Sequence, residues 1–583
     1  MGRRFDPDRA HFANIKLFWN MLSGMNLEMT LKRMAQSLLI VGPLASLAVS
    51  PGTNFDPINL IKLLIITPIA FFCFCLFLSS FKNLRKRLDS ILCYSLGLFL
   101  FAMFSTLLFS GAPFSQQIWG TFGRNTGLLT YLALILIFVG TAIIQKIDFY
   151  HKLVNSLLIT SLPMTAYCLI QYAGIDPIAW SEKNVFGTLG NINFSSAFFG
   201  FSSICALGLL FEKRFSFGIK VGIFLLILID MFIVLSTGSI QGFMIFVAGA
   251  GLTGFLYLRS NAKIRILSVP YAIISFIGVV FTVLGLSNKG PLAKFLFAPS
   301  IVFRTDYWHA GWRMTLDHPF FGVGMDSYGD WYRSSRGMIS TLRTGPERVA
   351  NTAHNIFLDL SSNGGFPLLI AFLAINFVAL RAAVIVLKRN SNFQPYFVAI
   401  LSTWFGYLIF SGISINQVGV GIWGWLFTGA LIGYEAATRG PSSNLQSNLK
   451  KISTKKNSSL APAAGILGFV GFALGFLLAY IPFNADVQYR NATKTAAMDQ
   501  IIKSTKVLGS TAYHTELALD TALKNNFQIQ IDLLTRQLVS SYPLDFMGWR
   551  SLQILPSATV TEKLLALEKI QELDPFNPDL PKS

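Results

Sequence analysis

Six arginines lie in one polar segment between two long apolar runs of this chain. Residues 288–361 contain Arg304, Arg313, Arg333, Arg336, Arg343 and Arg348. A guanidinium group keeps its charge and binds phosphate oxygens through two parallel hydrogen bonds, so these arginines favour a site for phosphate or pyrophosphate. The alternative is that long loops tolerate basic residues on either side of a membrane. We favour the phosphate interpretation because arginine stands at all six positions.

A histidine and an asparagine stand at the end of the same segment, directly before an apolar helical run. An unperturbed imidazole is largely neutral at pH 7, so His354 is suited to accept a proton from a hydroxyl group. It is equally suited to donate a hydrogen bond to phosphate. The structural alternative is that His354 and Asn355 only cap the helix that follows or pack against it. The sequence does not separate these roles.

Two further histidines in this segment raise the question of a zinc site. His309 and His318 accompany His354, and three imidazoles are a known zinc-ligand set. Their spacing is unlike that of ligand pairs such as H-E-x-x-H, and His318 precedes a proline at a turn. We therefore predict no metal site and no cofactor.

The rest of the chain must position these side chains, and its composition indicates a membrane protein. Of its 583 residues, 53% are hydrophobic and 13% charged, whereas a soluble domain carries about 25% charged residues. Repeated apolar runs that cross a hydrocarbon core of about 30 Å explain this composition. We predict an all-α polytopic membrane protein with about 12–13 transmembrane helices and a large external loop that contains helices. The runs lie near 34–50, 59–81, 88–111, 127–144, 152–173, 193–211, 218–236, 239–258, 266–287, 362–387, 395–413, 419–436 and 462–482.

Lysine and arginine concentrate in every second loop between these runs. The loops after the first, third, fifth, seventh and eleventh runs are nearly free of them. The positive-inside rule therefore places the N-terminus in the cytoplasm and residues 288–361 outside. The resulting division is a cytoplasmic segment 1–33, transmembrane helices 1–9 in 34–287, an extracytoplasmic catalytic loop 288–361, transmembrane helices 10–12 in 362–436, a basic cytoplasmic linker 437–461, transmembrane helix 13 in 462–482 and an extracytoplasmic helical domain 483–583.

The last hundred residues have nearly balanced charges and helical periodicity. Apolar residues recur at helical spacing from Ala518 to Leu523 and again from Leu564 to Ile570. The stretch from Leu567 to Pro578 is typical of the end of a tetratricopeptide helix, with an apolar stripe followed by a proline stop. We predict a small helical domain of tetratricopeptide type that presents or receives a partner.

Five short motifs follow one another through residues 110–370. They are Gly123-Arg-Asn-Thr-Gly-Leu128, Phe186-Gly-Thr-Leu-Gly-Asn-Ile-Asn-Phe194, Arg304-Thr-Asp-Tyr-Trp308, His318-Pro-Phe-Phe-Gly-Val-Gly324 and Ala353-His-Asn355. In this order they resemble the O-antigen ligase and polymerase superfamily of bacterial envelope glycosyltransferases. The ordered set is specific to the superfamily and does not distinguish its members.

The resemblance implies a metal-independent transferase in the bacterial plasma membrane, with its site facing outside or the periplasm. Such enzymes move a preassembled glycan from undecaprenyl pyrophosphate to an acceptor hydroxyl on a lipid, a glycan or a protein. The family's essential loop histidine and arginine match His354 and Arg304, which we expect to be catalytic. The family's further arginine at a middle span is replaced by Gln241 here. We expect Arg124, which also stands at an external span entrance, to contact the pyrophosphate instead.

Further substrate contacts are predicted around these positions. Gln241 keeps the place of the missing arginine, Asn355 directly follows His354, and Arg313 lies nine residues after Arg304. Asn191 and Asn193 open a span, where helix capping is the main expectation and contact with sugar or lipid the alternative.

Two other functions fit parts of the pattern. A polysaccharide polymerase would use the same donor chemistry and differ only in its acceptor. A transporter or flippase of a lipid-linked glycan would need ionisable residues within the spans, and few occur there. The expected partners are therefore the lipid-linked donor, the acceptor and membrane lipids. The net charge of +19 does not indicate nucleic acid, because the membrane divides the basic surface.

Overall fold

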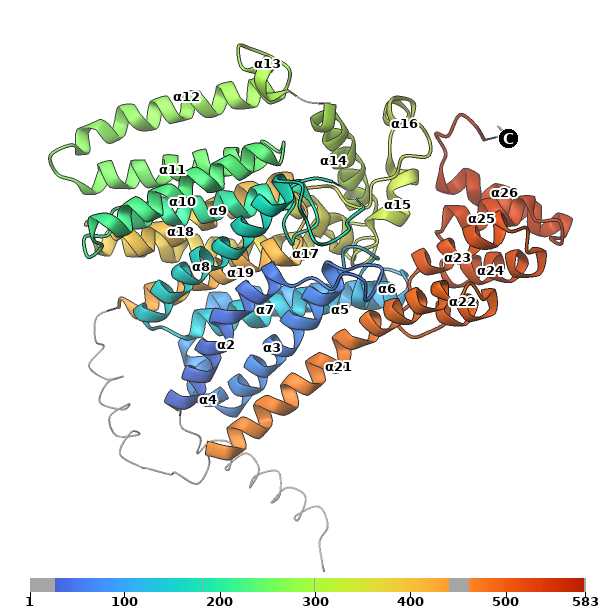
Figure 1. Cartoon of the computed structure of the whole chain (residues 1–583), viewed down its shortest axis with the longest axis horizontal. Coiled ribbons are helices and arrows are strands. Elements are labelled where there is room, and N and C mark those ends of the chain that lie inside the picture. Colours follow the sequence, from blue (N-terminus) through green and yellow to red (C-terminus); the bar gives the residue numbers. More distant parts are fainter. Residues whose placement is uncertain (1–26, 182, 298, 440–460, 581–583) are drawn as a thin grey trace, which may run out of the picture.

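The computed structural model describes residues 27–181, 183–297, 299–439 and 461–580, and within these ranges its regular structure is helical, without a strand (Figure 1). A helix satisfies every backbone hydrogen bond within its own segment, which a lipid environment requires. The all-α polytopic fold is therefore confirmed. The predicted N-terminal segment 1–33 and basic linker 437–461 lie largely outside the described residues.

Thirteen of the described helices coincide with the predicted spans. They are α2 (Leu27–Leu47), α3 (Asn59–Ser79), α5 (Ser90–Phe109), α7 (Leu128–Ile143), α8 (Ile147–Tyr172), α9 (Ile192–Leu210), α10 (Phe217–Ser236), α11 (Gln241–Ser260), α12 (Ser268–Leu286), α17 (Ile356–Arg389), α18 (Pro395–Ile413), α19 (Val418–Ala437) and α21 (Ala461–Lys494).

Ten of these helices are long and apolar enough to cross a membrane. The three others are α2, α7 and α19. Helix α7 has only 16 residues. Helix α2 carries charged residues in its first half, and α19 has Glu435 in its last turn and is buried along almost its whole length. A helix that contacts lipid must have an apolar surface, whereas a helix enclosed by other helices can carry more polar residues.

The long helices form one bundle around α19. Trp425 of α19 lies in an aromatic cluster with Phe99, Tyr131, Phe138 and Phe372, which come from the three helices α5, α7 and α17. At the other extreme, α12 lies at the edge of the bundle beside α11, and its side chains are almost all exposed (Figure 1). An apolar, exposed helix at the edge of a bundle is the arrangement expected of a lipid-facing helix.

A buried lysine joins two connections at one end of the bundle. Lys62 of α3 is fully buried, and its Nζ donates to the carbonyl oxygens of Ser46 (3.3 Å), Ala48 (2.9 Å) and Thr188 (3.1 Å). These bonds compensate for burying the ammonium group. They fix the start of α3 against the segment that leads into α9, and both segments line the cavity described below.

The predicted loop 288–361 is mostly helical. Its elements are α13 (Ala293–Leu296), α14 (Pro299–Asp317), α15 (Tyr328–Ser335) and α16 (Met338–Thr344). Four short elements lie at other connections: α4 (Phe81–Leu84), η1 (Arg85–Arg87), α6 (Phe114–Trp119) and η2 (Arg265–Leu267).

Helix α21 leaves the bundle and leads directly into a small helical domain (Figure 1). The domain contains α22 (Met498–Thr505), α23 (Ala512–Lys524), α24 (Gln528–Ser541), α25 (Phe546–Ile554) and α26 (Val560–Leu573), each packed against the next, with a core of its own. The predicted C-terminal helical domain is therefore present. Its tetratricopeptide character stays a prediction, because the helices vary from 8 to 14 residues without a fixed repeat.

A buried carboxylate fixes this domain to the bundle. Asp486 of α21 accepts hydrogen bonds from the backbone N–H of Asp56 (2.9 Å) and pairs with Nε2 of His514 (2.9 Å). Asp486 thus ties the connection between α2 and α3 to the first residues of α23.

Candidate functional site

A cavity of about 220 Å³ lies where five connections between long helices meet. Each of these connections was predicted to lie outside the membrane on the same side. The cavity is lined by Ile58, Asn59, Gly123, Arg124, Leu189, Gly190, Asn191, Asn193, Phe194, Arg304, His354, Ser414 and Ile415. The structure therefore brings together Arg124, Arg304 and His354, which are far apart in the sequence.

Arg124 is held by a tight loop that closes on a buried aspartate. Asp326 Oδ2 accepts hydrogen bonds from the backbone N–H groups of Thr121 (2.8 Å) and Thr126 (3.1 Å), on either side of Arg124. The loop starts at Gly120, whose φ is +86° and whose Cβ, if present, would lie 2.5 Å from Asp326 Oδ2. Only glycine fits there, because the φ value and the close approach both exclude a side chain.

The guanidinium of Arg124 has an unused donor inside the protein. Its Nη1 is buried and has no hydrogen-bond partner among the described residues. Burial lowers the pKa of Arg124, and the nearby Asp326 partly offsets this effect. A buried donor without a partner costs free energy, so an anion at this position would restore the missing bond.

Arg304 enters the cavity from α14. Burial lowers its pKa. Within the described part of the chain, no carboxylate oxygen lies within the 4.0 Å of an ion pair from its guanidinium. The neighbouring acid, Asp306, pairs instead with Arg343 at 2.9 Å. Arg304 therefore keeps its charge available to the cavity.

His354 stands between these arginines in a constrained backbone conformation. Its φ is +50°, a region that residues other than glycine seldom adopt. Two bonds hold it there: Thr352 Oγ1 accepts from the His354 N–H (3.1 Å), and Asp359 Oδ1 accepts from the Ala353 N–H (2.7 Å). The imidazole stacks on Tyr307, with 5.5 Å between ring centroids. Such strain is maintained only where the surroundings enforce it, and it concentrates at functional sites.

The charges in the cavity act on the histidine. Burial lowers the pKa of His354 to about 4, and Arg124 and Arg304 both contribute to the decrease. The free imidazole is therefore neutral at pH 7. An anion bound between the two guanidinium groups would offset their charge and raise the pKa of His354 again.

The glycine-rich turn after α14 positions these elements by docking into a kink of α17. The N–H groups of Val323 and Gly324 donate to the carbonyl oxygens of Ser362 (2.8 Å) and Asn363 (3.1 Å). At the kink, Gly365 has a φ of +70°, and a Cβ there would lie 2.5 Å from the Pro319 carbonyl oxygen. The His-Pro-x-x-Gly-x-Gly motif and the pair Gly364-Gly365 thus form the two sides of one backbone contact.

The other predicted substrate contacts have mixed outcomes. Asn191 and Asn193 line the cavity. Asn191 also caps α9 by accepting from the Asn193 N–H (2.8 Å), as predicted, and Asn193 accepts from the Ser239 hydroxyl (2.7 Å). Gln241, Arg313 and Asn355 are not among the lining residues.

Of these three, Asn355 has a structural role elsewhere. Asn355 Oδ1 accepts from the N–H groups of Phe357 (3.0 Å) and Leu358 (3.2 Å), so it caps α17. Gln241 opens α11 and is buried, without side-chain partners in the described ranges. Between the two residues considered for the second arginine position, Arg124 is the one that lines the cavity.

Two of the six arginines in the 288–361 segment serve the fold. Arg336 and Asp574 are fully buried and lie 2.7 Å apart, and Arg333 pairs with the same carboxylate at 3.0 Å. We call Arg333, Arg336 and Asp574 the Asp574 cluster. It joins α15 to the end of α26, so the phosphate interpretation is wrong for these two arginines.

Sequence reasoning did not assign to the site three residues that shape it. Asn59 lines the cavity, and its Nδ2 donates to the Gly123 carbonyl (2.7 Å). Asp326 and Asp359 orient the loops that carry Arg124 and His354. All three are polar residues in or beside predicted external loops, but their sequence gives no sign of which distant backbone they bind.

One comparison with known proteins bears on this geometry. Residues 222–373 match the sequence model of the family described as O-antigen ligase. The match extends from α10 into α17 and contains Arg304 and His354. The resemblance found in the motifs is therefore confirmed for this part of the chain. No curated protein sequence matches the chain.

Proposed function

Because the chain carries an O-antigen ligase region, we propose that it transfers a preassembled glycan from undecaprenyl pyrophosphate to an acceptor hydroxyl. The observation that carries this proposal is the pair Arg124 and Arg304, which are partly buried, have no carboxylate partner in the described structure and line one cavity with His354. The family match supports a membrane enzyme that acts on glycans. The donor, the acceptor and the side of the membrane are our proposal.

The reaction requires charge stabilisation at a leaving group. The acceptor oxygen forms a bond to the anomeric carbon of the glycan, while the bond from that carbon to the phosphate oxygen breaks. Negative charge then develops on the departing pyrophosphate. Guanidinium groups fixed in a water-poor cavity stabilise such charge without reorganising. Arg124 and Arg304 are placed for this role.

His354 has two possible roles in this reaction. As a general base, it would take the proton of the acceptor hydroxyl as the new bond forms. With a pKa of about 4 in the free site it is a weak base, and the bound pyrophosphate would strengthen it by offsetting the arginine charges. As a neutral hydrogen-bond donor it would instead contact a phosphate oxygen.

The proposed location is the outer side of the bacterial plasma membrane. All five connections that form the cavity come from loops that the positive-inside rule places outside. The C-terminal domain contacts two of these connections, through Asp56 and through the Asp574 cluster. The site and the domain are therefore proposed to face the same compartment.

The test is turnover of an undecaprenyl-pyrophosphate glycan, extracted from the source cells' membranes, by the purified full chain. We expect activity in the wild type, unchanged by EDTA, and loss of activity in Arg304→Ala and His354→Ala. His309→Ala and Arg343→Ala are matched controls, since His309 is exposed on the same helix and Arg343 already pairs with Asp306. Full activity in Arg304→Ala and His354→Ala would overturn the site, and mass analysis of the product identifies the acceptor.

A further inference from the structure

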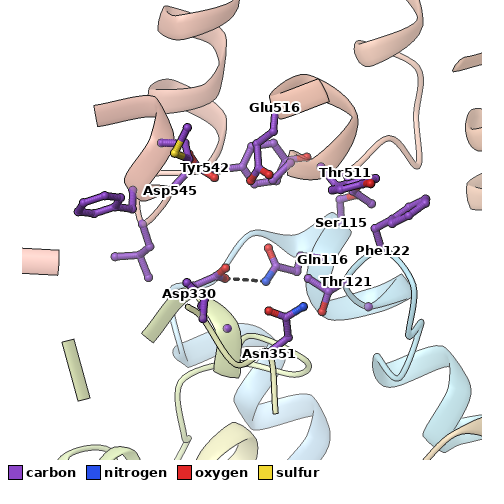
Figure 2. Close-up of a pocket in the computed structure, with 18 of the residues that line it drawn as sticks. Ser115, Gln116, Thr121, Phe122, Asp330, Asn351, Thr511, Glu516, Tyr542 and Asp545 are labelled. Atoms are coloured by element: carbon purple, nitrogen blue, oxygen red, sulfur yellow. Dashed lines mark hydrogen bonds between the residues drawn. The ribbon is translucent and has the colours of Figure 1, made fainter. Parts of the chain in front are cut away.

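A second cavity, of about 270 Å³, lies between the bundle and the C-terminal domain (Figure 2). Three separate regions contribute to it: α6 with the loop that follows, the segments around α15 and residue 351, and the helices of the C-terminal domain. We call it the seam cavity. It is lined by Ser115, Gln116, Gly120, Thr121, Phe122, Gly329, Asp330, Arg333, Val349, Asn351, Ser510, Thr511, Ala512, Tyr513, Glu516, Tyr542, Leu544, Asp545, Phe546 and Met547.

The lining of the seam cavity combines hydrogen-bonding groups with aromatic rings. Figure 2 shows amide, hydroxyl and carboxyl groups from all three regions converging on it. Tyr513 stacks on Phe122 at 4.3 Å between centroids, which places a flat aromatic surface beside these polar groups. Sugar rings present hydroxyl groups at their edges and C–H groups on their faces. Such a ligand therefore matches both parts of the lining.

The charge of the lining disfavours an anionic ligand. Its one cation, Arg333, is already bound to Asp574 at 3.0 Å and lies over the Phe546 ring. Three carboxyl groups, by contrast, face the cavity: Asp330, Glu516 and Asp545. Within the described residues, no group of acids, histidines or cysteines is arranged to hold a metal ion. With anions and metal ions disfavoured, the lining best fits an uncharged ligand.

The carboxyl groups are suited to an uncharged ligand because they are not all ionised. Burial raises the pKa of Asp330 to about 7. Burial raises the pKa of Asp545, and burial together with the nearby Asp545 raises the pKa of Glu516 to about 9. Protonated carboxyls donate hydrogen bonds and ionised ones accept them, so together they match the hydroxyl groups of a sugar, which do both.

The lining of the seam cavity is adjacent in sequence to the lining of the cavity that contains Arg124, Arg304 and His354, which we call the arginine site. Thr121 and Phe122 line the seam cavity, whereas the next two residues, Gly123 and Arg124, line the other cavity. Asp326 fixes this loop through the Thr121 and Thr126 N–H groups, so the two cavities share one rigid wall. The two cavities therefore lie on either side of the loop that carries Arg124.

We propose that the seam cavity binds uncharged, hydroxyl-rich sugar units of one of the two substrates. This inference rests on the proposed glycan transfer, because that function supplies a saccharide beside the arginine site. The seam would then set which glycan, or which length of glycan, the enzyme accepts. It would also give the C-terminal domain a direct part in substrate choice.

The first test measures binding without any reaction. The probe is the oligosaccharide released by mild acid from the lipid-linked glycans of the source cells, titrated calorimetrically into the full chain in detergent. We expect Tyr513→Ala to weaken binding about tenfold or more, since a stacking surface is lost, and Asn351→Ala to weaken it about threefold to tenfold. Ile529→Ala, at a residue 82% exposed on α24, is the matched control, and His354→Ala should bind like the wild type.

The second test separates the two sources of sugar by steady-state transfer. If the seam holds the donor glycan, Tyr513→Ala raises KM for the donor and leaves KM for the acceptor unchanged. If it holds the acceptor, the reverse is expected. The inference is overturned if Tyr513→Ala and Asn351→Ala change neither KM nor oligosaccharide binding in an active enzyme, and the proposed function would survive that result. Failure of the proposed function would instead appear as an inactive wild type, whatever its oligosaccharide binding.

Discussion

Two pairs of arginines in this protein differ in whether a carboxylate of the chain binds them. Arg333 and Arg336 both bind the buried carboxylate of Asp574, and Arg336 also donates to the Pro346 and Arg348 carbonyl oxygens. Arg124 and Arg304 are partly withdrawn from solvent, yet no carboxylate pairs with them in the described structure. The first pair holds two parts of the chain together, and the second pair leaves its charge for something outside the chain.

The difference shows which feature marks a ligand site. An arginine in a loop is ambiguous, because its guanidinium serves structure and recognition equally well. A buried arginine without a partner points more clearly to ligand recognition, because an unmatched buried charge destabilises the folded protein. The chain keeps two partly buried arginines without a carboxylate partner in one cavity, and Nη1 of Arg124 is fully buried there. That arrangement is explained if a bound anion completes it.

The largest effect is expected from removing the charges of the unpaired arginines. Arg304→Ala and Arg124→Ala should each lower kcat about 10²- to 10³-fold, the usual cost of losing one preorganised donor to a developing anion. The thermal unfolding midpoint should not fall, because an uncompensated buried charge disappears. Transfer assays and thermal unfolding in detergent provide the two measurements.

Lysine replacements sharpen this prediction. Arg304→Lys keeps the charge but loses the paired hydrogen bonds, so it should recover only part of the activity. If the alanine variants instead lose stability and keep their activity, the unpaired arginines belong to the fold, and the contrast with the Asp574 cluster disappears.

The next effect concerns stability rather than turnover. Arg336→Leu should destabilise the docking of α26 on α15 by about 3–5 kcal/mol, because it leaves Asp574 buried without its main partner. The double variant Arg336→Leu with Asp574→Leu should recover most of this loss, since no charge remains unmatched. Limited proteolysis of the C-terminal domain and thermal unfolding measure the docking.

A different order of stabilities would contradict this interpretation. If the double variant is no more stable than Arg336→Leu alone, the charge pairing is not what holds the domain. The matched control is Arg550→Ala, which removes an exposed pair with Glu347. Such a surface pair contributes roughly 0–1 kcal/mol, so little change is expected there.

The fold was largely predictable because lipid solvation imposes strong rules on sequence. Each predicted span coincides with a helix, although only ten meet a strict criterion of length and hydropathy. The three exceptions are enclosed by the bundle or carry polar ends. The helices of the 288–361 loop were predicted without their bounds, because α14 has an interrupted apolar pattern.

The site was predictable only where local chemistry is distinctive. Arg304 and His354 stand in short motifs, and Arg124 stands in another, so their types and order were visible in the sequence. The roles of Asp326 and Asp359 depend on backbone groups that come close only after folding. The same limit explains why Arg333 and Arg336 were first grouped with the ligand-binding arginines: their partner, Asp574, lies more than 200 residues away.

The pH dependence should reveal whether the unpaired arginines control His354. Proton acceptance requires the neutral imidazole, so activity falls as the pH drops through the pKa of His354. In the free enzyme that pKa is about 4, so kcat/KM should stay level down to about pH 5 on this account. Bound pyrophosphate offsets the arginine charges and raises the pKa, so the decline of kcat should begin at a higher pH.

The variants that test this point differ from those used above. His354→Gln keeps a hydrogen-bond donor but removes the titrating group. Loss of both activity and the acidic decline indicates a general base, whereas substantial remaining activity indicates that His354 serves as a hydrogen-bond donor to phosphate. Identical acidic declines of kcat and kcat/KM would contradict the electrostatic coupling between the histidine and the arginines.

The smallest effect is expected at Asn355. Like the Asp574 cluster, and unlike Arg124 and Arg304, its side chain already has partners within the protein. Its Oδ1 accepts from two N–H groups in the first turn of α17, so Asn355→Ala should cost about 1 kcal/mol of stability. Asn355→Ser and Asn355→Asp retain an N-cap acceptor and should restore that stability together with wild-type transfer. If Asn355→Ser is stable but loses activity more than tenfold, Asn355 contacts the substrate as the sequence first suggested. Helix capping would then be only part of its role, because a hydroxyl replaces the amide as a cap but not as a matched ligand for a bound glycan.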